Sequence, residues 1–380
     1  MPDFYEFFAG GGMARAGLGP DWHCLFANDF DPKKGRTYRE NWGDDELKIA
    51  DVRSLATTDI PGCSSMAWAS FPCQDLSLAG GGAGLTGDRS GAFWPFWKLV
   101  ETLVAEGRGP GIVALENVCG TLSSHGGKDF ATICGAFNRS GYSVGALVID
   151  ASLFVPQSRR RLFVIGVRAG MRLPENLAGN SPSSPWCTQA LTAAYEKLPP
   201  SVKANWIWWK LPLPLPRKAS FADIVEDAPE QAHWYSPAET RRLLDMMSSV
   251  NRAKLQQARM ENRRIVGTLY RRTRKDDCGR KVQRAEIRFD ISGCLRTPAG
   301  GSSRQVVLVV EVEALKARLI SSRETARLMG LPDAYKLPEN YNEAYHVTGD
   351  GVVVPVVRHL AHHLFEPLLE FSEFRTSTAA

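Results

Sequence analysis

The sequence lacks the features that mark secreted, membrane-spanning or zinc-stabilised proteins. Its eight cysteines include no CxxC pair; they stand at positions 24, 63, 73, 119, 134, 187, 278 and 294. We therefore expect neither a metal site nor a disulfide framework, and we expect the protein to work in a reducing cytoplasm. No apolar run approaches the roughly 20 residues that span a bilayer. The first residues have neither the basic start nor the apolar region of a signal peptide. We therefore expect no membrane partner.

The chain has little net charge, +5, but that charge is unevenly distributed. Residues 241–288 contain fifteen Lys and Arg and five Asp and Glu, a net of +10, whereas the remainder carries 31 basic and 36 acidic residues. A solvated helix face is the common explanation of such a basic segment. Because Tyr270 and Phe289 are interspersed among the cations, a surface that binds a polyanion is an equally good interpretation.

The first 170 residues alternate between short apolar runs and helix-length segments. A length of 380 residues with 44% hydrophobic and 23% charged residues is typical of a soluble globular protein with one large and one smaller domain. The alternation predicts an α/β fold with a parallel, doubly wound sheet, whose ligands lie beyond the carboxyl ends of the strands. The predicted strands are 5–8, 24–27, 65–69, 112–115, 143–148 and 162–167.

The character of the chain changes after Arg168. Residues 169–235 are rich in Pro, Ser and Trp, and the alternating Leu and Pro of residues 211–216 predict an extended connector. We expect the tryptophans of residues 206–209 to be buried by packing rather than to stack on bases. Ser236-Pro237-Ala238-Glu239 has the residues that begin a helix. Residues 268–272 and 285–289 read as two strands joined by a turn.

A glycine turn, Phe8-Ala9-Gly10-Gly11-Gly12, follows the first predicted strand. Asp29 closes the second strand 17 residues after Gly12, an arrangement that suits a nucleotide-like cofactor whose ribose binds the carboxylate. The third glycine of the dinucleotide fingerprint is missing, which argues against NAD or FAD. Asp51 could hold an adenine amino group or could simply cap a helix.

Several further motifs occur in a fixed order, and together they resemble the C5-cytosine-specific DNA methyltransferases of bacteria and phages. They begin with the turn at Phe8 and the acids Asp29 and Asp51, and the resemblance covers most of the chain. The others are Phe71-Pro72-Cys73-Gln74, Glu116-Asn117-Val118, Gln157-Ser158-Arg159-Arg160-Arg161, residues 322–332 (SRETARLMGLP) and residues 349–355 (GDGVVVP).

The resemblance implies a Rossmann-like methyltransferase fold that uses S-adenosyl-L-methionine, with a second, smaller target-recognition domain. The implied domains are a catalytic and cofactor-binding domain at residues 1–168, a DNA-binding domain at 169–317, and a segment at 318–380 that returns to the first domain. Cofactor contacts are then expected from Phe8, Gly10, Gly12, Asp29, Asp51, Pro72, Asp350 and Val352.

The chemistry of cytosine supports the match, because C5 becomes nucleophilic only after covalent addition at C6. Cys73 is the expected nucleophile, since a thiolate suits this addition. Glu116 is the expected buried acid at N3, and Arg161 and Arg159 are expected to bind the cytosine O2 or a nearby phosphate. Such a reaction requires that the base leave the duplex. Residues 78–91, which contain six glycines, would close over it.

Double-stranded DNA is the expected partner, and we expect a monomer with no obligate protein partner. His359, His362 and His363 are better explained by an amphipathic C-terminal helix than by a metal site.

Two alternatives stay open, an RNA C5-cytosine methyltransferase and a non-catalytic DNA-binding protein. An amino-group methyltransferase is disfavoured because the sequence has no Asp/Asn-Pro-Pro-aromatic tetrapeptide. The expected DNA contacts are Gln74, Arg89, Gln157, Arg271, Arg272, Arg274, Arg296 and Arg304.

Overall fold

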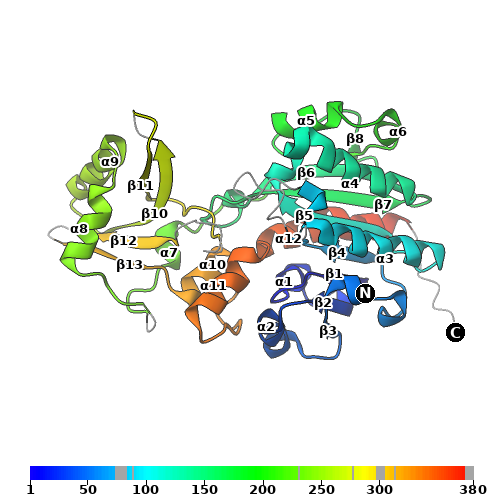
Figure 1. The fold of residues 1–380 in the computed structure, drawn as a ribbon, viewed down its shortest axis with the longest axis horizontal. Coiled ribbons are helices and arrows are strands. Elements are labelled where there is room, and N and C mark those ends of the chain that lie inside the picture. Colours follow the sequence, from blue (N-terminus) through cyan, green and yellow to red (C-terminus); the bar gives the residue numbers. More distant parts are fainter. Residues whose placement is uncertain are drawn as a thin grey trace. The chain divides into compact units, whose positions relative to one another are not determined.

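The computed structural model describes residues 1–72, 84–87, 90–229, 232–275, 278–296, 304–311 and 314–372. The chain forms two compact units, and each is discontinuous in sequence (Figure 1). Unit 1 comprises residues 1–150, 160–214 and 351–380, and unit 2 comprises residues 151–159 and 215–350.

Unit 1 is built on one mixed sheet. Within the described residues the sheet has seven strands in the order β3-β2-β1-β4-β5-β7-β6 (Figure 1). Six of them, β6 included, run in one direction, and β7 alone runs antiparallel to its neighbours β5 and β6, so the predicted parallel sheet is confirmed except at this strand. The strands are β1 (Asp3–Phe7), β2 (His23–Asp29), β3 (Leu47–Ile49), β4 (Met66–Ala69), β5 (Ile112–Val118), β6 (Tyr142–Asp150) and β7 (Arg160–Arg168).

Helices cover both faces of this sheet, because most of its strand residues are apolar and must be buried on both sides. Tyr5 and Phe7 of β1 belong to a core shared with α3 and α4. Trp68 of β4 points to the other face, where its ring meets Phe365 at 6.4 Å. The helices of unit 1 are α1 (Met13–Leu18), α2 (Pro32–Trp42), α3 (Phe93–Ala105), α4 (Lys128–Arg139), α5 (Gln189–Glu196), α6 (Pro200–Lys203), α12 (Val354–Leu360) and α13 (Glu366–Ser372).

The tryptophan-rich segment packs into unit 1. Trp209 is fully buried, and the tilted rings of Trp206 and Tyr195 pack with their centroids 5.3 Å apart. The short strands β8 (Ala178–Gly179) and β9 (Trp208–Trp209) pair antiparallel, and Ile207 N–H donates to the carbonyl of Val144 in β6. The expectation that these tryptophans pack is confirmed, and residues 169–214 stay with unit 1 instead of beginning a new domain at 169.

Unit 2 contains a separate antiparallel sheet with its own core. Its order is β11-β10-β12-β13 in the part of unit 2 that the structure describes. The strands are β10 (Ile265–Lys275), β11 (Lys281–Arg288), β12 (Val306–Val310) and β13 (Leu315–Leu319). The helices are α7 (Phe221–Ile224), α8 (Pro237–Asp245), α9 (Ser249–Met260), α10 (Ser322–Leu328) and α11 (Tyr341–Asp350). The predicted helix start at Ser236 is confirmed, since Ser236 and Glu239 form a capping box.

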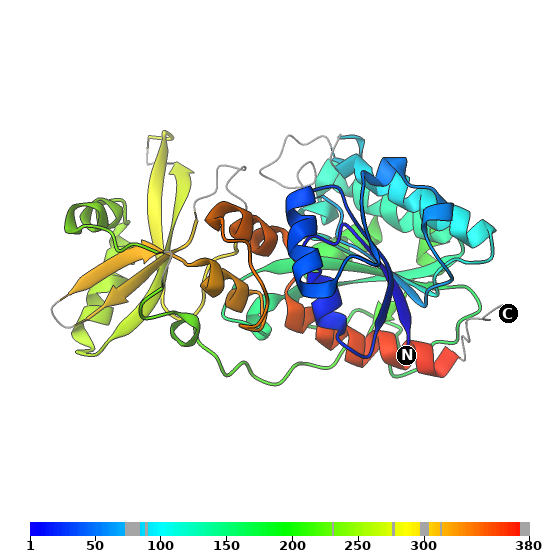
Figure 2. The same cartoon turned by 90° about the horizontal axis from the view of Figure 1, so that it is seen from below.

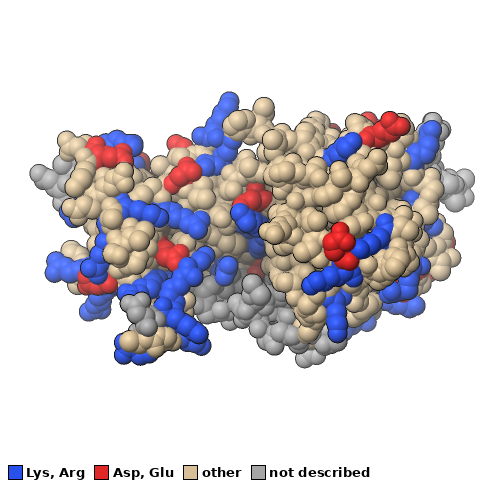
Figure 3. All heavy atoms as spheres, turned by 90° about the horizontal axis from the view of Figure 1, so that it is seen from above, with Lys and Arg blue, Asp and Glu red and all other residues tan. Residues whose placement is uncertain are grey.

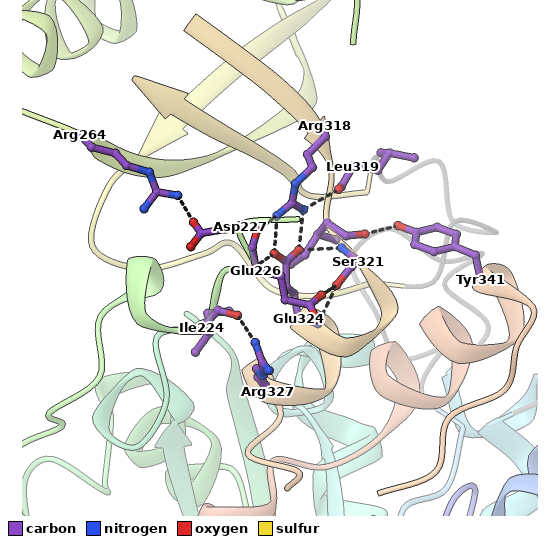
Figure 4. A network of polar contacts seen from close by, with 11 residues as sticks. Ile224, Glu226, Asp227, Arg264, Arg318, Leu319, Ser321, Glu324, Arg327 and Tyr341 are labelled. Carbon is purple, nitrogen blue, oxygen red and sulfur yellow. Dashed lines mark hydrogen bonds and ion pairs between the residues drawn. The ribbon is translucent and has the colours of Figure 1, made fainter. Parts of the chain in front are cut away.

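A buried ion pair between β13 and α10 also holds the main chain at Glu226 (Figure 4). The Arg318 guanidinium contacts both Glu324 oxygens, at 2.6 and 2.8 Å, and both side chains are fully buried. Arg318 also donates to the main-chain carbonyl of Glu226, whose N–H donates to Glu324. Residues 318–350 are therefore held in unit 2, where the sequence led us to expect a return to the catalytic domain at residue 318.

Candidate functional site

The glycine turn joins β1 to α1 through left-handed backbone. Phe8, Gly10 and Gly12 have φ angles of 57°, 58° and 77°. Gly12 is the N-cap of α1, and a Cβ atom there would collide with the Trp42 indole, so only glycine fits. A Cβ at Gly10 would meet no atom of the described residues within 4 Å. The backbone at Gly10 therefore borders open space that a ligand can enter.

Asp29 fastens the end of β2 to this turn. Its Oδ2 accepts the Gly10 N–H at 2.8 Å, and its Oδ1 accepts the Asp31 N–H at 2.8 Å. Burial raises the pKa of the Asp29 carboxyl, although the charge of Lys34 and these N–H donors act in the opposite direction. The ribose contact expected of Asp29 stays a prediction, with one oxygen already committed to the glycine turn.

Asp51 caps a turn, which was one of its two expected roles. Its Oδ1 accepts the Arg53 N–H at 2.9 Å at the start of the 3₁₀ turn Val52–Ser54. Its Oδ2 pairs with the Arg53 guanidinium at 3.1 Å, and the side chain is half exposed. The adenine contact therefore stays a prediction.

Glu116 and Arg161 form an ion pair at the carboxyl end of β5. Antiparallel pairing places Val118 opposite Arg161, so that the side chains of Glu116 and Arg161 lie on one face of the sheet. Arg161 Nε lies 3.0 Å from Glu116 Oε1, with side-chain exposures of 17% and 7%. The sequence separates the two by 45 residues, and the expected burial of Glu116 is confirmed.

Asn117 links this pair to the segment that leads to Cys73. Its Nδ2 donates to the carbonyl of Phe71 at 3.1 Å, and its Oδ1 accepts the Val118 N–H at 2.8 Å. Phe71 is buried against Phe93, at 5.5 Å between ring centroids. Cys73, Gln74 and Arg89 lie outside the described residues. The structure thus fixes the chain up to Pro72, one residue before the predicted nucleophile.

Two residues of the Gln-x-Arg-x-Arg element lie inside unit 2. Gln157 is fully buried, donates to the Leu328 carbonyl at 2.9 Å and accepts the Leu295 N–H at 2.9 Å. A side chain so enclosed cannot contact DNA, so the expected DNA contact of Gln157 is wrong. Its hydrogen bonds instead stabilise the interior of unit 2. Arg159 is 2% exposed and donates to the carbonyls of Leu295 and Gly349. Its catalytic role stays a prediction.

The other predicted DNA-binding residues differ in exposure. Arg271, Arg272 and Arg274 are exposed on β10, and Arg296 is exposed as well. Arg304 is partly buried, lies over the Tyr341 ring at 5.2 Å and donates to the Asn342 side chain. Figure 3 shows Lys and Arg gathered over part of the surface of unit 2, to which these residues belong.

The predicted cofactor residues near the C-terminus lie where the chain passes from one unit to the other. Asp350 is exposed at the end of α11, and Val352 is buried just before α12. The three histidines lie on the predicted C-terminal helix, which includes a π-helical turn at Ala361–Phe365. His359 Nε2 lies 2.9 Å from the Pro212 carbonyl. Among the described residues, no group of three His, Cys, Asp or Glu side chains could hold a metal ion.

Two residues near the glycine turn and the end of β2 were not predicted from the sequence. Glu6 lies in β1 with 1% exposure, and its Oε1 accepts the Arg15 N–H of α1 at 3.3 Å. Burial raises the pKa of Glu6 to about 8, against the opposing influence of Arg15. Phe30 is 66% exposed directly after Asp29. Glu6 could have been recognised in the sequence as an acid between the apolar Tyr5 and Phe7. Phe30 could have been recognised as an aromatic residue directly after an acid that ends a strand.

No helix in the described part of the chain combines the length and apolarity that crossing a membrane requires.

The sheet order, the glycine turn and the acids at the strand ends define a Rossmann-like fold of the methyltransferase type. The sequence model of the C-5 cytosine-specific DNA methylases matches residues 3–366, and the chain belongs to this family. The protein is accordingly a DNA cytosine methyltransferase, with DNA as its substrate and a methyl donor as its second substrate.

Individual relatives agree with this membership. The chain is 24% identical to the type II methyltransferase M.Bsp6I of Bacillus sp. (strain RFL6) over 378 residues, covering 97% of this chain and 100% of that one. It is 23% identical over 363 residues to M.HhaI of Haemophilus parahaemolyticus, with coverages of 95% and 93%. The solved structure of the Entamoeba histolytica methyltransferase EhMeth is similar with a TM-score of 0.64 and 13% identity, covering 97% and 99% of the chains, which supports the fold.

Proposed function

We propose that the protein transfers a methyl group from S-adenosyl-L-methionine to C5 of a cytosine flipped out of duplex DNA, through a covalent bond between Cys73 Sγ and cytosine C6. The observation that carries this proposal is the Glu116–Arg161 pair, 3.0 Å apart and largely buried. Asn117 ties this pair to the Phe71 carbonyl, two residues before Cys73. The structure thus brings together, at the carboxyl end of β5, the acid Glu116, the guanidinium of Arg161 and the segment that leads to Cys73.

The residues around the glycine turn fit the proposed cofactor. The open space at Gly10 gives a ligand access to the backbone, and Asp29 lies beside it as a hydrogen-bond acceptor. Phe30 offers an exposed aromatic face to an adenine ring, and Asp51 a half-exposed carboxylate to an amino group. When bound, S-adenosyl-L-methionine supplies the electrophilic methyl group.

The residues of the chain then activate and release the base. The Cys73 thiolate forms the Sγ–C6 bond, the π electrons of C5–C6 form a C4–C5 double bond, and the π electrons of C4–N3 take a proton at N3 from Glu116. Arg161 donates hydrogen bonds to O2, which orients the ring. C5 takes the methyl group with the electron pair of the C4–C5 double bond, and the bond between that methyl group and the donor sulfur breaks. Loss of the C5 proton to a base then restores the C5–C6 double bond as the Sγ–C6 bond breaks, and the N3 proton returns to Glu116.

We further propose that unit 2 supplies sequence recognition and that the enzyme acts as a monomer. Exposed cations on β10 and β11 would follow the phosphates and read base edges, because phosphate contacts position a protein while base contacts specify the site.

Trapping on DNA that contains 5-fluorocytosine tests the covalent step, since fluorine at C5 blocks the release of the thiol. Plasmid DNA substituted throughout with 5-fluorocytosine removes the need to know the recognised site in advance. We expect the wild-type chain with S-adenosyl-L-methionine to give a denaturant-resistant adduct and Cys73→Ser to give none. With ordinary DNA, Glu116→Gln should lower kcat by about 10²- to 10⁴-fold.

Cys63→Ser is the matched control, because Cys63 is a partly buried cysteine of unit 1 that belongs to none of the family motifs. It should form the adduct as the wild type does. An adduct on tRNA but not on DNA would support the RNA alternative. An adduct with Cys73→Ser would contradict Cys73 as the nucleophile.

A further inference from the structure

The hairpin of β10 and β11 extends beyond the rest of its sheet. β10 pairs with β12 only over residues 265–269 but with β11 over residues 268–275 (Figure 2). All five side chains from Arg271 to Lys275 are exposed. The end of the hairpin is therefore a two-stranded ribbon, a shape that the major groove of duplex DNA admits.

The two faces of this hairpin differ. Leu269, Ala285 and Ile287 belong to the core of unit 2, together with Met247 and Leu255. Side chains alternate along a strand, so Tyr270, Arg272 and Arg274 point to the opposite face. We call the latter the arginine face; in β11 it includes Arg284, Glu286 and Arg288, by the pairing register.

Tyr270 and Glu286 form the centre of the arginine face. They lie directly opposite each other, and the Tyr270 hydroxyl donates to Glu286 Oε2 at 2.8 Å. The Arg272 and Arg288 guanidinium groups lie 5.1 and 5.7 Å from the centroid of the Tyr270 ring, which is only 4% exposed. The tyrosine is thus enclosed beneath the cations.

Glu286 holds the outer arginines by charge. Arg274 donates through Nε and Nη2 to Glu286 Oε1 at 3.0 and 2.5 Å, and Arg272 Nε lies 3.8 Å from Oε2. Burial acts to raise the pKa of Glu286, but the hydrogen bonds from Tyr270 and Arg274 and the arginine charges outweigh it and lower that pKa. The carboxylate is mostly covered, whereas Arg272 and Arg274 remain 42% and 50% exposed.

Like charges that face each other across β10 and β11 destabilise this hairpin. Arg272 lies directly opposite Arg284, and Lys275 opposite Lys281, and like charges in these positions destabilise a strand pair. Among the described residues of the arginine face, the one carboxylate, Glu286, cannot neutralise the four arginines. A polyanionic partner would offset this repulsion, and the family's DNA substrate is one.

From these contacts we infer that Tyr270 and Glu286 are positioning residues, which orient Arg272 and Arg274 to read base edges in the major groove of duplex DNA. A guanidinium held by one partner through fixed atoms presents its remaining N–H groups in a defined direction, as bidentate contact with a guanine requires. The inference rests on the proposed role of unit 2 in recognition and goes beyond it in separating the arginines that touch DNA from the residues that hold them.

Glu286→Gln separates positioning from simple charge. Removing an acid from a cationic surface should strengthen binding to any duplex, whereas loss of positioning should weaken the preference for the recognised site. We expect the ratio of the Kd for a scrambled duplex to the Kd for the selected duplex to fall about tenfold. The full-length chain would select its duplexes from a random library by binding alone, and fluorescence anisotropy would give both Kd values, so the test does not depend on methyl transfer.

Three further variants complete the design. Glu261→Gln removes an exposed acid of the same basic segment, paired with Arg263 at 2.5 Å, and should leave the ratio within about twofold of wild type. Tyr270→Phe deletes the hydroxyl without changing charge, and Arg274→Lys keeps the charge without the planar fork. Both should lower the ratio and leave the Kd for the scrambled duplex nearly unchanged.

A ratio in Glu286→Gln equal to that in Glu261→Gln would overturn the inference, because charge alone would then explain the effect. An unaltered ratio in Tyr270→Phe and Arg274→Lys would overturn it as well, and these two variants decide the matter if thermal unfolding shows that Glu286→Gln is misfolded. A chain that shows this ratio change but no adduct at Cys73 would contradict the proposed chemistry while supporting the recognition surface.

Discussion

At the scale of single residues, Glu6 is expected to make stability depend on pH. Burial raises the pKa of Glu6 to about 8, above its ordinary value of 4.5. The folded chain therefore keeps a proton that the unfolded chain has released, and stability falls as pH rises between these values. We expect Glu6 to contribute a slope of about 1.4 kcal/mol per pH unit in that window, measured by urea unfolding.

Glu6→Gln supplies the comparison, because glutamine resembles the protonated acid and does not titrate. The wild type should lose stability relative to Glu6→Gln from about pH 5 to about pH 8, and the difference should level off above that pH. A difference independent of pH would show that Glu6 is charged in the folded protein.

At the scale of elements, the pair formed by Arg318 of β13 and Glu324 of α10 should be indispensable to unit 2. Both side chains are fully buried, so removing one leaves a charge without its partner in a dry site. We expect Arg318→Met or Glu324→Gln to destabilise the chain by about 3–5 kcal/mol in thermal unfolding. The double variant Arg318→Met with Glu324→Leu should recover much of this loss, because no buried charge remains.

An exposed pair of the same unit is the control for this element. Arg263→Ala breaks a contact whose side chains are 70% and 43% exposed, and should cost less than about 1 kcal/mol. A loss in the double variant as large as the sum of the two single variants would contradict the role given to the buried pair.

At the scale of the whole molecule, the uneven charge should make DNA binding strongly salt-dependent. Residues 241–288 carry a net charge of +10, and the rest of the chain is negative. Four phosphate contacts would release enough counterions to weaken binding about 10²-fold between 50 and 200 mM salt. Anisotropy titrations with DNA would show this slope, while calorimetric titration with S-adenosyl-L-methionine should change far less. A flat DNA response would contradict a polyanion-binding role for the basic segment.

Much of unit 1 follows from local pattern. Six of its seven sheet strands and its glycine turn could be predicted because each depends on neighbours in sequence, as does the capping box at Ser236 in unit 2; the short β3 was not predicted. The reversed direction of β7 could not, because an apolar run gives no strand direction. The ordered motifs identified the family because the reaction requires particular residue types, and residue types can be read directly from the sequence.

What the sequence determined by itself was the class of reaction, together with a set of residues proposed to carry it out. Only the tertiary structure decided which of those residues meet. It paired Glu116 with Arg161, turned Gln157 inward, raised the pKa of Glu6 and placed Tyr270 beneath two arginines. Each of these depends on burial and on strand pairing between residues far apart in the chain. Burial changes the free energy of a charge, and strand register decides which face a side chain shares.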